Sequence, residues 1–302
     1  MSNAAVQHLM RGQSADGGWG AYAGTVSRTE STALATLALW ANAASGEAGP
    51  LDAGRAWLET RQLASGAWPL GDDLAEPSWS TSLATLALSH FAPESERIAS
   101  AARWLLGQKG RGTPWWGKIY FWFFPDRRAV ELDPDLIGWP WMPDTFSWVE
   151  PTSYAVMALT RLGGAVDRGR VDGRLEEADR LLLDRACEGG GWNYGNTRVL
   201  GEELWPYPDT TALALLALAH RPEAAEVAEG LAALGRMLEE NDSVLSLGLG
   251  GLAYRAHGVD ATAVRERLAL KLGAWEGGET RALAWAALAL APSEDPLGVR
   301  RA

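Results

Sequence analysis

The chain has 302 residues, of which 38 are acidic and 27 basic, so its formal charge is −11. This acidic balance, without a basic stripe, argues against nucleic acid as a partner. Its one cysteine, Cys187, excludes an internal disulfide and a cysteine-based zinc cluster, and we expect no metal or other cofactor. We also expect a cytoplasmic protein, because the first residues lack signal-peptide features and the apolar runs are too short to span a bilayer.

One unit recurs along the chain: a glycine-rich turn ends in tryptophan, and an Ala/Leu-rich helix that contains threonine follows. The first copy runs from Gln13 to Trp19 with its helix at 32–39, and the second from Gln62 to Trp68 with its helix at 81–88. A third copy ends at Trp192. Such internal repeats indicate a repeat architecture. We interpret 1–302 as one domain, because no linker interrupts the units.

Two kinds of helix alternate along the chain. Amphipathic helices, which suit an outer layer, are predicted at 4–11, 52–62, 95–108, 174–187, 223–239 and 260–272. Helices that are apolar all round, which suit a buried inner layer, are predicted at 32–40, 81–89, 152–160, 211–219, 243–256 and 280–290. Six such pairs predict an all-α fold, an (α/α)6 toroid. An open solenoid is the alternative, but it would expose two apolar ends.

The turns agree with this fold. Their glycines permit positive φ after an outer helix, and the glutamines Gln13 and Gln62 can bind helix-end carbonyls. The tryptophans that close the turns are expected to be buried anchors: Trp19, Trp68, Trp192 and Trp275.

These Gln-x-x-x-Gly-x-Trp turns, joined to Thr/Ala/Leu helices, resemble the repeats of squalene and oxidosqualene cyclases. Protein prenyltransferase β-subunits carry related repeats. Besides the two full copies, a loosened copy runs from Gln108 to Trp115. The resemblance covers nearly the whole chain and implies one toroid, where full cyclases have two. It therefore also implies a second toroid subunit as a partner, self-association, or a lid of its own.

The resemblance further implies a proton donor. Cyclases of this kind carry an aspartate just before an inner helix, and Asp209, followed by Thr210, Thr211 and Ala212, matches it. The prenyltransferase zinc site needs Asp-x-Cys, and this motif fails here because Arg185 stands two residues before Cys187.

A long aromatic insertion is predicted at 110–147, between the third outer helix and its inner partner. Long ordered loops are usually functional, so we interpret it as a lid or pocket wall. A self-packed plug is one alternative, and contact of 119–124 with a membrane surface is another. The aromatic residues of this region are Trp115, Trp116, Tyr120, Phe121, Trp122, Phe123, Phe124, Trp139, Trp141, Phe146 and Trp148.

Carboxylates gather at the starts of the inner helices: Glu30, Glu150, Asp209 and Glu279. As first-turn acids they would satisfy free N–H groups and the helix dipole, which is the interpretation we favour for Glu30 and Glu279. A carboxyl group in a dry cleft is also a candidate acid. We therefore assign proton donation to Asp209 and a supporting polar role to Glu150.

These observations predict a class II terpene cyclase-like protein that protonates an isoprenoid or another elongated apolar substrate. Such chemistry needs a protonated carboxylic acid, aromatic faces for the cation and exclusion of water. The expected substrate-binding residues are Trp116, Trp139, Trp141, Phe146, Trp148, Trp205 and Tyr207. One alternative is a non-catalytic toroid that binds lipid or protein. Another is a carbohydrate-active toroid with Asp144, Glu150 and Asp209 as its carboxylates.

Overall fold

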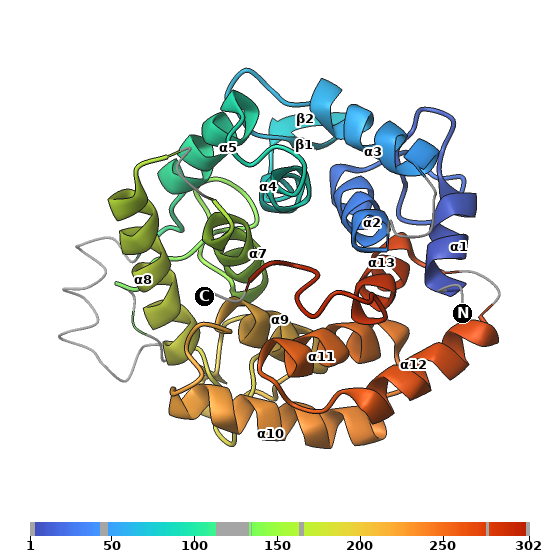
Figure 1. Cartoon of the computed structure of the whole chain (residues 1–302). Coiled ribbons are helices and arrows are strands. Elements are labelled where there is room, and N and C mark those ends of the chain that lie inside the picture. The colour runs from blue at the N-terminus through green and yellow to red at the C-terminus, as the bar shows by residue number, and fades with distance from the viewer. Residues whose placement is uncertain are drawn as a thin grey trace.

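The computed structural model describes residues 4–42, 48–112, 133, 135–162, 166–275 and 278–299. These residues form twelve helices and two small antiparallel hairpins, so the fold is all-α. Six helices make an inner ring and six surround them (Figure 1). The inner helices are α2 (Thr29–Ala41), α4 (Thr81–Ser89), α7 (Val149–Thr160), α9 (Pro208–Ala217), α11 (Val244–Ala256) and α13 (Thr280–Ala289). The outer helices are α1 (Ala4–Gly12), α3 (Ala48–Thr60), α5 (Glu96–Gly107), α8 (Arg168–Asp184), α10 (Ala225–Glu240) and α12 (Thr262–Gly273).

The ring is closed by the two ends of the chain. The last inner helix, α13, packs against the first inner helix, α2, and against the first outer helix, α1. Every other inner helix packs against the outer helix that follows it, so α1 supplies the outer partner that α13 lacks downstream. The closed toroid is confirmed, and the open solenoid is wrong.

Burial follows the two sequence patterns. Helix α4 is buried along its whole length, as expected of a helix that is apolar on every side. Helix α5 buries one face through Ile98 and Leu105, while Arg103 stays exposed. Each leucine that the fold removes from water contributes roughly 1.5–3 kcal/mol. The hydrophobic core includes the inner helices on all their sides and the inward faces of the outer helices.

The repeated tryptophans tie four of the inner helices to the preceding outer helix. Four of them, buried in the wall of the ring, donate their backbone N–H to an inner-helix threonine: Trp19 to Thr32, Trp68 to Thr81 and Trp139 to Thr152, each at 2.9 Å, and Trp192 to Thr211 at 2.8 Å. Their indole Nε1–H groups donate to carbonyls near the ends of the outer helices, those of Leu9, Leu58, Leu105 and Leu182, at 2.6–2.9 Å. The predicted anchor role of Trp19, Trp68 and Trp192 is confirmed, whereas Trp275 is only partly buried.

The third repeat differs from the sequence interpretation. We expected its tryptophan to be Trp115, which lies outside the described residues, but Trp139 makes the bonds of the repeat. The extra chain therefore lies between Gln108 and Trp139. The loop that follows Trp139 corresponds to the connection that leads into an inner helix in the other repeats.

The turn glutamines link neighbouring outer helices. Gln13 donates to the carbonyls of Gly17 and Pro50, and Gln62 to those of Gly66 and Arg97. The expected partners were carbonyls at a helix end, but Pro50 and Arg97 lie in the first turn of the next outer helix. The positive φ expected of the turn glycines is confirmed, at 89° for Gly17 and 90° for Gly66.

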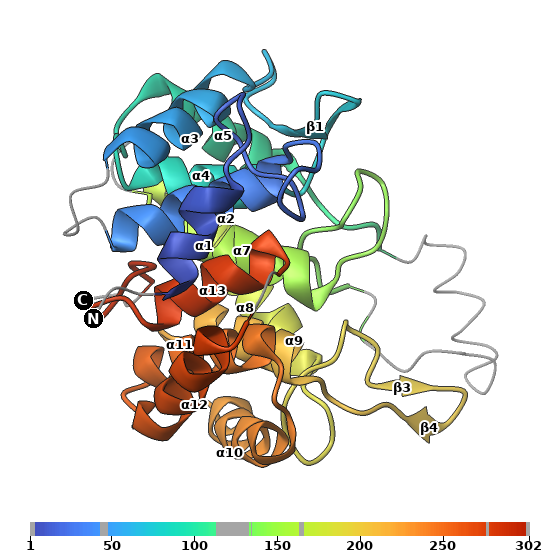
Figure 2. The same ribbon diagram turned by 90° about the vertical axis from the view of Figure 1, so that its right-hand side faces the viewer.

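The two rims of the ring differ. The connections into the inner helices project from one rim, which we call the mouth. It carries the hairpins β1 (Pro69–Gly71) with β2 (Leu74–Pro77) and β3 (Arg198–Val199) with β4 (Glu202–Glu203) (Figure 2). The segment 291–299 crosses the ring at the opposite rim (Figure 1), where Leu297 and Val299 are buried. No helix among the described residues is both long and apolar enough to cross a lipid bilayer.

Candidate functional site

Four aromatic side chains form a column that runs from the mouth into the ring. Trp141 meets Trp79 edge to face, with ring centroids 4.7 Å apart, and Trp79 stacks on Tyr154 at 5.8 Å. Tyr154 in turn stacks on Trp285 at 6.4 Å. Trp141 is half-buried, whereas Tyr154 and Trp285 are fully buried. The column therefore joins the mouth to the centre of the ring through residues of three separate repeats.

A cluster of charged groups lies beside the column. Arg281 on α13 donates from one terminal nitrogen to Oε1 of Glu150 and to the Tyr154 hydroxyl, the latter at 3.2 Å. Tyr154 itself donates to Glu150 at 2.9 Å. The Arg281 Nε atom lies 3.7 Å from Oε1 of Glu30, on α2. We call these four residues the Arg281 cluster, which connects three inner helices.

The two carboxylates of the Arg281 cluster are held differently. Glu150 is 5% exposed, and its Oε1 accepts hydrogen bonds from both Tyr154 and Arg281. Oε1 of Glu30 is buried without a hydrogen-bond partner among the described residues, and so is Nε of Arg281. Burial raises the pKa of Glu30 to about 7; the charges of Glu150 and Glu279 add to the rise, and Arg281 opposes it. At neutral pH the cluster therefore keeps a proton on Glu30 for a large share of the time.

Asp209, the predicted proton donor, lies in the first turn of α9 and is half-buried at the mouth. Its Oδ1 accepts a hydrogen bond of 2.5 Å from Ser246, near the start of α11. The carboxyl group is thus tied to the neighbouring inner helix. Its position at an inner-helix start is as predicted.

The other predicted site residues separate into groups. Trp141 and Glu150 meet at the column and its cluster, whereas Trp139 is buried in the wall with the other repeat tryptophans. Trp148 is half-buried at the start of α7, and Trp116 lies outside the described residues. Three residues are exposed at the mouth: Phe146 (61%), Trp205 (82%) and Tyr207 (48%).

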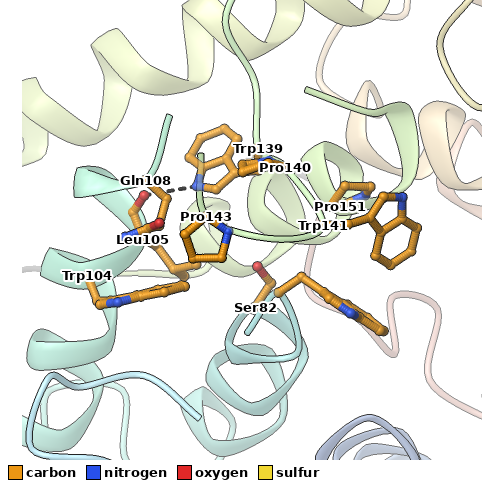
Figure 3. Close-up of a pocket in the computed structure, with 10 residues that line it drawn as sticks. Ser82, Trp104, Leu105, Gln108, Trp139, Pro140, Trp141, Pro143 and Pro151 are labelled. Atoms are coloured by element: carbon orange, nitrogen blue, oxygen red, sulfur yellow. Dashed lines mark hydrogen bonds between the residues drawn. The ribbon is translucent and has the colours of Figure 1, made fainter. Parts of the chain in front are cut away.

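A narrow aromatic cleft opens next to the column (Figure 3). Its volume of about 10 Å³ is room for about one water molecule. Pro143 points into it between Trp104 and Ser82, and Gln108 borders it (Figure 3). A larger ligand must displace these side chains.

The histidines lie away from the mouth. His90 follows α4 at the opposite rim, and burial lowers its pKa to about 3, with a contribution from Arg161. His220 donates to or accepts from Asp179 at 2.8 Å, and Arg221 donates to the same carboxylate at 2.8 Å. These bonds connect α8 to the end of α9, beside an open surface hollow of about 590 Å³. Neither histidine can serve as a partner for Asp209 in this structure.

The described residues offer no metal site, since no group of three or more His, Cys, Asp or Glu side chains converges among them. Asp72 and Asp73, which are turn acids, form ion pairs with Arg61 and Arg28. Asp144, a carboxylate of the carbohydrate hypothesis, lies in an exposed turn with positive φ, 62°. It is not part of the Arg281 cluster.

Sequence reasoning missed two parts of the site. Glu30 lies in the first turn of α2, as predicted, but its Oε1 satisfies no helix N–H. Arg281 went unnoticed, although it is the one charged residue in the apolar run of α13. A lone arginine in a buried helix is the signal that could have identified the cluster, because buried charges are paired.

Several solved structures are similar to this chain at low sequence identity. A crystal structure of a protein from Actinoplanes is 19% identical, with a TM-score of 0.51 over 90% of this chain and 78% of that chain. The α2-macroglobulin of Escherichia coli is 15% identical, with a TM-score of 0.50 over 95% of this chain and 17% of that one. The type II terpene cyclase MstE from Scytonema, in complex with geranylgeranyl dihydroxybenzoate, is 19% identical, with a TM-score of 0.42 over 79% and 77% of the two chains.

No protein-family model and no curated protein sequence matches the chain. At such low identities the structural likeness concerns the toroid alone.

Proposed function

We propose that this toroid binds an elongated apolar substrate of the isoprenoid class at its mouth and starts a cyclisation by protonating it. The observation that carries the proposal is the aromatic column, which runs from Trp141 inward and meets the Arg281 cluster at Tyr154. Aromatic faces attract a cation, and a carboxyl group in a dry site is a suitable general acid.

The column suits a cation that moves along a substrate. The ring faces of Trp79 and Tyr154 are parallel to within 18°, and those of Tyr154 and Trp285 to within 7°. Glu150 is held between two donors, so it is a fixed acceptor beside the column. We assign it a positioning role: it orients Tyr154 and Arg281 and offsets the charge of the arginine.

Access to the column requires side-chain movement. The aromatic cleft has room for about one water, and Pro143 and Trp104 narrow it. The segment at 291–299 crosses the opposite rim, so we propose that the substrate approaches through the mouth. Displacement of Pro143 from Trp104 would expose the Trp141 end of the column. Return of Pro143 after the substrate has bound would exclude water from the site.

A second candidate function is non-catalytic binding of a lipid or a protein. The packed centre favours it, because Tyr154 and Trp285 are fully buried and the cleft is small. In that case the exposed aromatic residues of the mouth, such as Trp205 and Tyr207, would form the contact surface.

Incubation of the purified protein with linear isoprenoids of increasing length, including geranylgeranyl aromatics and squalene, tests the proposal. Mass spectrometry of the extracts should reveal a cyclised isomer. The product should be reduced in Asp209→Asn or in a variant of the Arg281 cluster. It should be unchanged in Asp242→Asn, a matched change of an exposed carboxyl group that pairs with Arg267 and Lys271. Substrate retained without conversion would favour the binding function instead.

A further inference from the structure

We infer that Glu30 holds and delivers the proton at the mouth, which makes it a catalytic residue of the reaction proposed above. The inference rests on that proposed function. It assigns to Glu30 the role that the sequence had assigned to Asp209.

The geometry of the Arg281 cluster separates its two carboxylates. The Arg281 guanidinium faces both carboxylates. Glu150 accepts hydrogen bonds from a terminal nitrogen of Arg281 and from the Tyr154 hydroxyl. Glu30 receives only the longer approach of Nε, at 3.7 Å, and its own Oε1 is buried without a hydrogen bond. The Glu30 side chain is 24% exposed, but its Oε1 is buried, and a charged oxygen that is buried without a donor is costly. Protonation of Glu30 removes this cost.

The charge balance of the cluster leads to the same assignment. With both glutamates ionised, one arginine faces two negative charges, and Glu279 adds a third nearby. A proton on Glu30 leaves a neutral pair of Arg281 and Glu150. The groups that face Glu30 from the packed helices are Arg281 and Glu279 of the α13 repeat and Glu150 and Tyr154 of α7. The pKa of Glu30, raised to about 7, agrees with this balance.

Asp209 has a different environment. Its Oδ1 accepts a short hydrogen bond from Ser246, which anchors the carboxyl group to α11. Glu30 adjoins Arg281, and that arginine also bonds to Tyr154 in the aromatic column. A proton that leaves Glu30 therefore departs next to the aromatic faces that would stabilise the resulting cation.

The step balances without another cofactor. The O–H bond of the Glu30 carboxylic acid breaks, and the π electrons of a substrate alkene form the new C–H bond. The carbocation is left on the more substituted carbon, and the Glu30 carboxylate is left facing Arg281. After ring closure the cation loses a proton to water, and Glu30 takes a proton back from solvent. The net reaction is an isomerisation.

Two measurements test the inference. The first is infrared spectroscopy of the wild-type protein, in which Glu30 should give a protonated-carboxyl band at about pH 6 that declines as the pH passes about 7 and is absent in Glu30→Gln. This measurement needs no substrate. The absence of the band from the wild type, or its persistence in Glu30→Gln, would overturn the inference.

The second measurement is product formation. Glu30→Gln, which keeps the side-chain shape, should reduce the rate by about 100-fold or more, as expected for loss of a general acid. Asp242→Asn is the control, and thermal unfolding verifies that each variant is folded. A wild type that makes product while Glu30→Gln makes it equally fast overturns the inference and leaves the proposed function standing. A wild type that converts no isoprenoid overturns the proposed function and the catalytic role of Glu30 with it, and the infrared band then still reports whether the proton is held.

Discussion

Thr152 accepts the backbone N–H of Trp139 at 2.9 Å, across the same interval of 13 residues that separates Thr32 from Trp19 and Thr81 from Trp68. This relationship fixes the starts of α2, α4 and α7 against the ends of the outer helices before them. It therefore aligns these three starts, and with them Glu30 and Glu150 at the mouth.

The threonine of this tie should contribute measurably to stability. Thr81→Val removes the acceptor of the buried Trp68 N–H and should lower the free energy of unfolding by about 1–3 kcal/mol, because a buried donor is left unsatisfied. Urea unfolding measures the change. Thr25→Val is the control: its hydroxyl bonds to the backbone of Tyr22 in an exposed turn, where water can replace these bonds, so stability should change by less than about 0.5 kcal/mol. Equal effects of the two substitutions would contradict the tie.

Trp139 should behave as a structural residue. Trp139→Phe removes the indole that donates to Leu105 and leaves space in the wall, so we expect a loss of about 2–4 kcal/mol, similar to that of Trp68→Phe. Trp205→Phe, at an 82% exposed position, should leave stability unchanged. A Trp139→Phe variant of normal stability with an altered product would instead place this ring against the substrate.

The pH dependence of stability should report Glu30. Its pKa is about 7 in the folded protein and about 4.5 in the unfolded chain, so the folded state binds the proton more tightly. Its contribution to stability is therefore fully present below about pH 4.5 and is lost as the pH rises through about 7. The stability of Glu30→Gln relative to the wild type should increase by about 3 kcal/mol over this range.

Denaturant unfolding at several pH values measures that difference. Subtracting the free energy of unfolding of the wild type from that of the variant cancels the titration of other groups. Asp242→Asn, whose carboxylate is exposed, should show no comparable rise near neutral pH. A difference between Glu30→Gln and the wild type that stays flat from acid to neutral pH would show that Glu30 titrates as an ordinary carboxyl group.

The ring could be predicted from the sequence because its pattern is local. Apolar runs such as α4 and amphipathic runs such as α5 each indicate how deeply their own helix is buried. The repetition of such helix pairs six times predicts that they close into a ring. The Arg281 cluster could not be predicted in the same way. Glu150 and Arg281 are 131 residues apart, and only closure of the ring brings them together. Trp139 could have been recognised from its interval of 13 residues to Thr152, which the long insertion before it concealed.

Arg281 should be coupled to the carboxylates that it faces. Arg281→Met leaves Glu150 buried beside Tyr154 without its cation, so we expect a loss of about 3–5 kcal/mol at neutral pH. The double variant Arg281→Met/Glu150→Gln should recover much of this loss, because the uncompensated charge is gone. Denaturant unfolding of the two single variants and the double variant gives the coupling energy.

The control for this cycle is Arg103 with Glu96, an exposed ion pair on α5 whose coupling should stay below about 1 kcal/mol. The Arg281→Met variant should also regain stability as the pH falls, since protonation neutralises the carboxylates that lost their partner. Additive single substitutions, or a loss that does not depend on pH, would show that Arg281 acts through packing against the ring and not through its charge.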